Sequence, residues 1–215
     1  MFVTVALGTV LLGMLAGVGA CRRRVPDPER AAMAAGIRRP EATPFAPFAD
    51  LDGQDFYLCC NMRFNAEHDA SDANYAYPEV QGYTLYAGTR VHVVGVRWND
   101  ITLRPEGRND TFNIDFRFGT QRMNGRQYFH KILVTTDPRS ALADAPPAIA
   151  EAVRQGQLIP GMSKEQALLA RGYPPFHHTA GIESDEWTYY QNRGFVHLVR
   201  FVDGKITSIE RVAAP

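Results

Sequence analysis

Residues 52–136 alternate between apolar and polar positions in short runs that predict β-strands. The first run places five apolar residues on one face of a single strand: Phe56, Leu58, Cys60, Met62 and Phe64. Similar runs at 91–96, 101–103, 111–118 and 128–134 predict further strands, and turn residues around Asn99, Gly107 and Asn124 separate them. We therefore expect 52–136 to form a small all-β domain, either a barrel or a rolled sheet.

The pattern after residue 145 changes to a helical one. A short helix is predicted at 149–157, entered through Pro146-Pro147. Ser163 and Gln166 form the signature of a capping box, in which each side chain bonds a backbone N–H of the first turn. The helix that they begin is expected to end at Gly172, because glycine adopts positive φ without strain.

Strand periodicity returns after Asp185. Trp187 and Tyr189 are expected on one face of a first strand, and Phe195, His197, Val199 and Phe201 on one face of a second. Asp203-Gly204 is a strong hairpin signal before a third strand at 206–212. Residues 145–212 are therefore predicted to be an α+β module, with two helices layered on a three-stranded antiparallel sheet and Trp187 between them.

Three short sequence motifs in this module resemble those of a known family. Gly161-Met162-Ser163-Lys164-Glu165-Gln166, then Gly172-Tyr173-Pro174, then Trp187-Thr188-Tyr189 follow the order found in the BamE (SmpA/OmlA) family. The chain resembles these bacterial outer-membrane lipoproteins over roughly its last third. The resemblance implies a lipid-anchored, periplasm-facing module that binds other envelope proteins, with the β-barrel assembly machinery as one candidate partner. The same layering resembles the repeat unit of secreted β-lactamase inhibitors, so an inhibitor or ligand-sequestering module is the alternative.

The first 20 residues form a charge-free apolar run that ends in Val18-Gly19-Ala20-Cys21. Small residues before a cysteine are typical of a lipoprotein signal peptide, which makes Cys21 the candidate site for fatty-acid (palmitate) attachment. The run is also long enough to span a bilayer, and basic residues follow rather than precede it. An uncleaved anchor with a cytoplasmic domain is therefore a second interpretation. Residues 21–51 are rich in Arg, Pro and Ala and are expected to be a tether.

The charge and the motif content of the chain narrow the set of possible functions. Lys plus Arg and Asp plus Glu number 23 each, so no net field attracts nucleic acid. The chain contains no GxSxG, HExxH, phosphate-binding loop or CxxC motif. Cys59 and Cys60 are expected on opposite faces of a strand, and His177 and His178 in a solvated loop, so we expect no enzymatic activity, no cofactor and no metal site. His197 is expected to be a core histidine.

Candidate partner contacts come from two surface segments. Tyr75, Tyr77 and Tyr83 lie in a long loop at 65–83, and Arg193 lies in the turn between two predicted strands. Tyrosine and arginine are frequent binding anchors, although tyrosines folded back over the barrel are equally compatible with this sequence. The sequence predicts a cell-envelope lipoprotein that is positioned at the outer membrane by its lipid and binds proteins.

Overall fold

The computed structural model describes residues 50–74, 82–192 and 194–214. All described residues belong to one compact unit. The signal or anchor segment, and all of the tether except Asp50 and Leu51, lie outside the described residues. Within the described ranges, no helix has the length and apolar character needed to cross a membrane.

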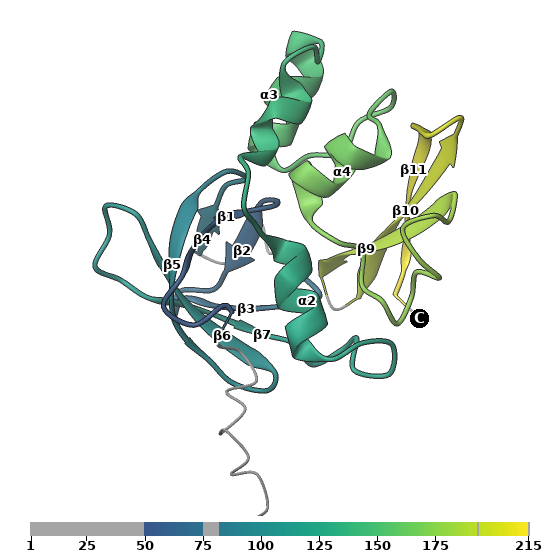
Figure 1. Ribbon diagram of the computed structural model, residues 1–215. Coiled ribbons are helices and arrows are strands. Elements are labelled where there is room, and N and C mark those ends of the chain that lie inside the picture. Colours follow the sequence, from purple (N-terminus) through teal and green to yellow (C-terminus); the bar gives the residue numbers. More distant parts are fainter. Residues whose placement is uncertain (1–49, 75–81, 193, 215) are drawn as a thin grey trace, which may run out of the picture. The chain divides into compact units, whose positions relative to one another are not determined.

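A curled six-stranded sheet dominates the first part of this unit (Figure 1). Its spatial order is β3-β7-β6-β5-β1-β8, and all its pairings are antiparallel except that of β3 with β7. The strands are β1 (Asp55–Leu58), β3 (Asp69–Ser71), β5 (Arg90–Val96), β6 (Asp100–Pro105), β7 (Phe112–Asp115) and β8 (Leu133–Val134). A separate two-stranded sheet pairs β2 (Met62–Phe64) with β4 (Tyr83–Leu85).

Alternation explains which residues of this sheet form the core. Every second residue along β6, β7 and the first half of β5 is buried, and the residues between them are half-buried or exposed. The fully buried positions are Val91, Val93, Ile101, Leu103, Phe112, Ile114 and, just beyond β7, Phe116. Burial of each such side chain contributes about 1.5–3 kcal/mol. The strands predicted at 91–96 and 101–103 are thus confirmed. The strand predicted at 111–118 is shorter, because β7 ends at Asp115 and Phe118 is only half-buried.

The prediction of one continuous strand over 56–64 is wrong. The chain leaves the sheet after Leu58 and starts a new strand at Met62. Between them, Cys59 and Cys60 form a vicinal disulfide, which two side chains on opposite faces of a strand cannot make. Asn61 is buried and bonds to the backbone of distant segments, so the apolar alternation there reflects two separate strands.

The prediction of a strand beginning at Tyr128 is also wrong, and with it the expectation of an all-β domain. Residues Gly125–Ile132 form helix α2. Asn124 Oδ1 accepts the Gln127 N–H at 2.9 Å, and Gln127 Oε1 accepts the Asn124 N–H at 2.9 Å, which completes a capping box. Tyr128, Phe129 and Ile132 are buried at helical spacing, and only Leu133–Val134 pairs as a strand.

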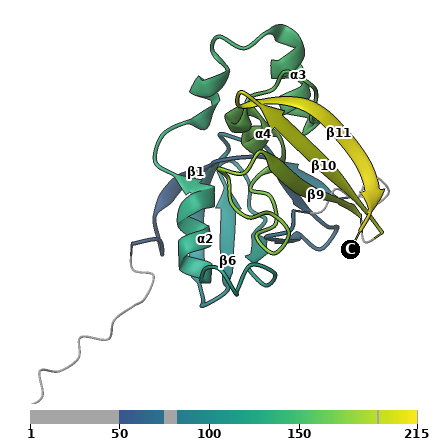
Figure 2. The same ribbon diagram turned by 90° about the vertical axis from the view of Figure 1, so that its right-hand side faces the viewer.

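The predicted α+β module is confirmed at the level of its elements. After the short 3₁₀ turn η1 (Pro138–Leu142) come α3 (Pro147–Gln155) and α4 (Lys164–Arg171). Three strands then form an antiparallel meander in the order β11-β10-β9: β9 (Glu186–Asn192), β10 (Phe195–Val202) and β11 (Lys205–Ala213). Figure 2 shows α4 against the curved face of this sheet. The fold as a whole is therefore mixed α+β.

Local signals of the module have the predicted geometry. Gln166 N donates to Ser163 Oγ at 3.1 Å and Ser163 N donates to Gln166 Oε1 at 2.9 Å, so the capping box is complete. Gly172 ends α4 with φ of +76°. Asp203 and Gly204 have φ of +49° and +72°, the pair of positive values that a tight hairpin requires.

Trp187 lies at the centre of the module core. Its side chain is 0% exposed, and its ring centroid lies 4.6 Å from that of Phe201. The same apolar cluster includes Met162, Ala167 and Ala170 from the α4 segment, as predicted for a tryptophan between sheet and helix. The predicted face of β10 is only partly confirmed. Val199 and Phe201 are buried, but Phe195 is 37% exposed beyond a bulge.

Candidate functional site

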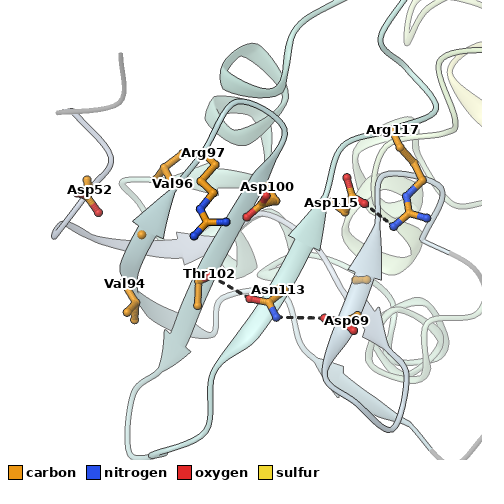
Figure 3. A pocket seen from close by; sticks show the side chains of 12 residues that line it. Asp52, Asp69, Val94, Val96, Arg97, Asp100, Thr102, Asn113, Asp115 and Arg117 are labelled. Carbon is orange, nitrogen blue, oxygen red and sulfur yellow. Dashed lines mark hydrogen bonds and ion pairs between the residues drawn. The ribbon is translucent and has the colours of Figure 1, made fainter. Parts of the chain in front are cut away.

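A polar groove lies on the outer face of β3, β7, β6 and β5 (Figure 3). Thr102 Oγ1 donates to Asn113 Oδ1 at 2.9 Å, and Asn113 Nδ2 donates to Asp69 Oδ1 at 3.1 Å, which fixes a row across three strands. Asp115 pairs with Arg117, and its cross-strand neighbour Asp100 lies in the next row. The cavity volume is about 680 Å³.

The chemistry of the groove is that of hydrogen bonding and charge. Among the described residues, its lining contains no histidine, cysteine or serine, and Gly95 leaves part of its floor open. Arg97 and Arg117 lie on either side of the neighbouring carboxylates of Asp100 and Asp115. In the described part of the chain, no three His, Cys, Asp or Glu side chains gather in a way that would hold a metal ion. Such a groove suits a polar ligand held by direct hydrogen bonds.

Tyr83 is the one predicted partner contact that the structure describes. Its side chain is 40% exposed at the start of β4. The Tyr83 ring meets His68 edge-on at 4.4 Å between centroids, and His68 stacks on Phe112 at 4.4 Å. The Arg108 guanidinium lies 5.5 Å from the Tyr83 centroid and 5.0 Å from that of Phe112. We call Tyr83, Arg108, Phe112 and His68 the Tyr83 cluster.

The other predicted functional residues lie outside the described residues. These are the lipidation candidate Cys21 and the partner-contact candidates Tyr75, Tyr77 and Arg193. Their roles therefore stay predictions.

The cysteine prediction needs a correction. On opposite faces of a strand the two cysteines could not bond, and Cys59 would be a free thiol. In the structure Cys59 and Cys60 are bonded to each other. Cys60 is fully buried and Cys59 packs on the same core. The pair lies in the bend between β1 and β2.

His177 and His178 both contact Tyr190, a contact that the sequence analysis did not predict. Tyr190 Oη lies 2.6 Å from His178 Nε2 and 3.3 Å from His177 Nε2. Burial lowers the pKa of both imidazoles, and for His177 the neighbouring His178 lowers it further. The predicted solvated loop is instead bonded to β9.

A buried polar network joins the sheet-rich first part of the unit to the α+β module. The sequence analysis did not predict the residues of this network. Asn61 Nδ2 donates to Val153 O at 2.7 Å and Ala170 O at 3.2 Å, and Asn61 Oδ1 accepts the Ala87 N–H at 2.9 Å. Asn74 Nδ2 donates to both Asn61 O and Arg171 O at 2.8 Å. We call this set of contacts the junction network.

Two arginines belong to the junction network. Arg63, on β2, donates from its backbone N to Asn74 Oδ1 at 2.8 Å and from Nη2 to Gly156 O at 3.0 Å. Arg171, the last residue of α4, is 5% exposed and donates from Nη2 to Tyr190 O at 2.8 Å. Burial, with a contribution from the charge of Arg63, lowers the pKa of Arg171 to about 9.

Comparison with known proteins adds no relative. No family model, no curated protein and no solved structure matches this chain.

Proposed function

We propose that this chain is a cell-envelope lipoprotein that works as a protein-binding module in the manner of BamE-like proteins. The proposal rests on the structural roles of the residues that carry the family resemblance. Ser163 and Gln166 cap α4, Gly172 ends it, and Trp187 and Tyr189 fill the space under the meander. The three short sequence motifs thus act together in one helix–helix–sheet module, which supports reading them as one motif.

We assign to the partner the exposed part of the Tyr83 cluster, Tyr83 and Arg108, which lies on buried Phe112. Tyrosine and arginine are the residue types most enriched among binding hot spots, and here they are stacked on one another. Arg108 is also held by Asp110, whose Oδ2 lies 2.7 Å from Arg108 Nη2. Because ring contacts and an ion pair restrict these side chains before binding, a partner that covers them loses little additional side-chain entropy.

The test is a pull-down of the tagged, membrane-bound chain from detergent-solubilised envelopes, with quantitative mass spectrometry. Tyr83→Ala and Arg108→Ala are each expected to reduce capture of the main partner at least about tenfold, since hot-spot truncations cost about 2 kcal/mol or more and each 1.4 kcal/mol is about tenfold in affinity. Tyr86→Ala is the matched control, because Tyr86 is 55% exposed close to Tyr83 in the sequence.

Two outcomes would contradict the proposal. The first is fractionation of the wild-type chain with the cytoplasm, and the second is equal capture by Tyr83→Ala, Arg108→Ala and wild type. Enrichment of β-barrel assembly components would identify the partner expected from the resemblance. Enrichment of a secreted hydrolase would instead favour the inhibitor alternative.

A further inference from the structure

The polar groove of Figure 3 is a preformed cavity to which the partner-binding role of the Tyr83 cluster does not extend. Its lining comes mainly from β3, β5, β6 and β7, and among the described residues it includes no member of that cluster. The cavity volume of about 680 Å³ is within the range of roughly 300–1,000 Å³ that small-molecule sites occupy. Because side chains on paired strands are held more precisely than those on loops, the groove presents a fixed pattern of polar groups.

Donors and acceptors are mixed at the centre of the groove. Thr102, Asn113 and Asp69 form one hydrogen-bonded row across β6, β7 and β3. Within the described residues, the Asn113 amide uses one donor and one acceptor position in this row, and an amide offers two of each. The Thr102 hydroxyl donates in the row, so its oxygen can accept from a ligand. A ligand above the row therefore meets donors and acceptors side by side.

The charges of the lining favour a ligand that has no net charge of its own. Among the described residues, the lining contains more carboxylates than guanidiniums: Asp52, Asp69, Asp100 and Asp115 against Arg97 and Arg117. The excess of carboxylates disfavours an acidic ligand, because like charges brought together repel. The two arginines, on either side of Asp100 and Asp115, disfavour a basic ligand for the same reason, and Arg117 already pairs with Asp115. A neutral compound with many hydroxyl groups meets neither repulsion.

A tryptophan lies in the turn at one end of the groove. Trp98 stands between the lining residues Arg97 and Asp100, and its side chain is 77% exposed. Arg97 N donates to Asp100 O at 2.8 Å, which closes the turn. Phe116 N donates to Asn99 O at 2.6 Å, which ties the turn to the end of β7. A large aromatic ring held at the surface is typical of binding sites, where it supplies contact area at a low cost in side-chain entropy.

We propose that the groove binds a neutral saccharide, with Trp98 stacked on a sugar ring. The C–H bonds on one face of a pyranose ring carry partial positive charge, which matches the negative π-face of an indole. The hydroxyls around the ring each donate and accept, as the row of Thr102, Asn113 and Asp69 does. Val94, which is 40% exposed in the lining, adds apolar area beside these polar groups.

Tryptophan fluorescence of the full chain in a sugar-free neutral detergent provides the first test. The chain has two tryptophans, and Trp187 is 0% exposed, so acrylamide quenching reports chiefly on Trp98. The probes are neutral tetrasaccharides of glucose, galactose, mannose and N-acetylglucosamine, and the charged comparisons are tetragalacturonate and tetralysine. At least one neutral tetrasaccharide is expected to protect Trp98 from quenching and to shift its emission to shorter wavelength. Neither charged compound is expected to do so.

Isothermal titration calorimetry of variants with the same tetrasaccharide locates the site. Asn113→Ala is expected to weaken binding roughly 5- to 100-fold, because it leaves ligand hydroxyls unpaired. Trp98→Ala is expected to weaken it about tenfold or more, as truncation of an aromatic anchor does. Tyr86→Ala removes an exposed ring outside the groove lining and is expected to bind as wild type does. Emission from buried Trp187 shows whether each variant is folded, and if one of the two groove variants is not, the other decides.

Three results would overturn the proposal. The first is a lack of both protection and binding heat with all the neutral tetrasaccharides. The second is preferential binding of a charged compound, and tetralysine in that case would assign the groove to a basic peptide. The third is equal saccharide affinity in wild type, Asn113→Ala and Trp98→Ala. The pull-down with Tyr83→Ala and Arg108→Ala measures a different surface, so either proposal can fail without the other.

Discussion

Replacement of Asn61 by alanine is expected to destabilise the whole described unit. The Asn61 side chain is 3% exposed and satisfies three backbone groups, the Ala87 N–H and the carbonyls of Val153 and Ala170. Val153 O keeps a second donor, the Gly156 N–H at 3.0 Å. The variant therefore leaves about two buried backbone groups unpaired, and each such group costs about 1–3 kcal/mol. We expect a loss of about 3–5 kcal/mol in the free energy of unfolding, including the small cavity left by the side chain.

Urea denaturation provides the assay, with far-UV circular dichroism and tryptophan fluorescence followed on the same samples. Trp187 is buried in the α+β module, and the circular dichroism signal reports both parts of the unit. Because Asn61 connects them, wild type is expected to unfold in one transition, and Asn61→Ala is expected to shift the midpoint down by about 1–3 M. Asn113→Ala, in the open groove, should change stability by less than about 1 kcal/mol.

Two results would refute the reasoning on Asn61. One is an Asn61→Ala variant within about 1 kcal/mol of wild type, which would mean that water replaces the lost bonds. The other is a wild-type chain whose two probes report separate transitions, since the junction network would then not couple the two parts.

Three further predictions follow from individual side chains. Trp187→Ala should cost about 3–5 kcal/mol in the same urea assay, because a fully buried indole is removed from the core; an unchanged midpoint would show that the tryptophan is not part of it. Since burial lowers the pKa of His177 and His178, their contribution to stability is present above about pH 6.5 and lost as the pH falls through the folded-state pKa values. The wild-type melting temperature should therefore drop more between pH 7.5 and 5 than that of His178→Gln, and parallel curves would refute this. Cys21→Ser should abolish labelling by a fatty-acid analogue, whereas a wild-type chain that takes up no label would favour the uncleaved anchor.

Local signals were sufficient to predict the α+β module. The capping box at Ser163, the glycine at 172 and the Asp203-Gly204 hairpin each involve residues within a few positions of one another, so their physics is visible in the sequence. The helix α2 had such a signal as well, the pair Asn124 and Gln127. It was outweighed by an apolar run that fits a strand or a buried helix equally well.

The candidate sites were largely invisible in the sequence because their contacts are distant along the chain. Asn61 bonds carbonyls 92 and 109 residues away, so nothing near it distinguishes it from a surface asparagine. Arg171 ends an amphipathic helix, where a basic residue is expected at the surface. The outer groove likewise depends on the parallel pairing of β3 with β7, which no turn residue in the sequence indicates.

The strand order has a consequence for how the chain is made. β1 lies between β5 and β8, so Leu58 finds its second neighbour, Leu133, only after a further 75 residues have been synthesised. The carbonyl of Ala170 that Asn61 needs comes later still. An emerging N-terminal portion therefore has an unfinished sheet with exposed edges and an unpaired asparagine, and it gains little by folding early. For a chain delivered N-terminus first, by the ribosome or across a membrane, this topology favours an extended nascent segment that closes in one late step.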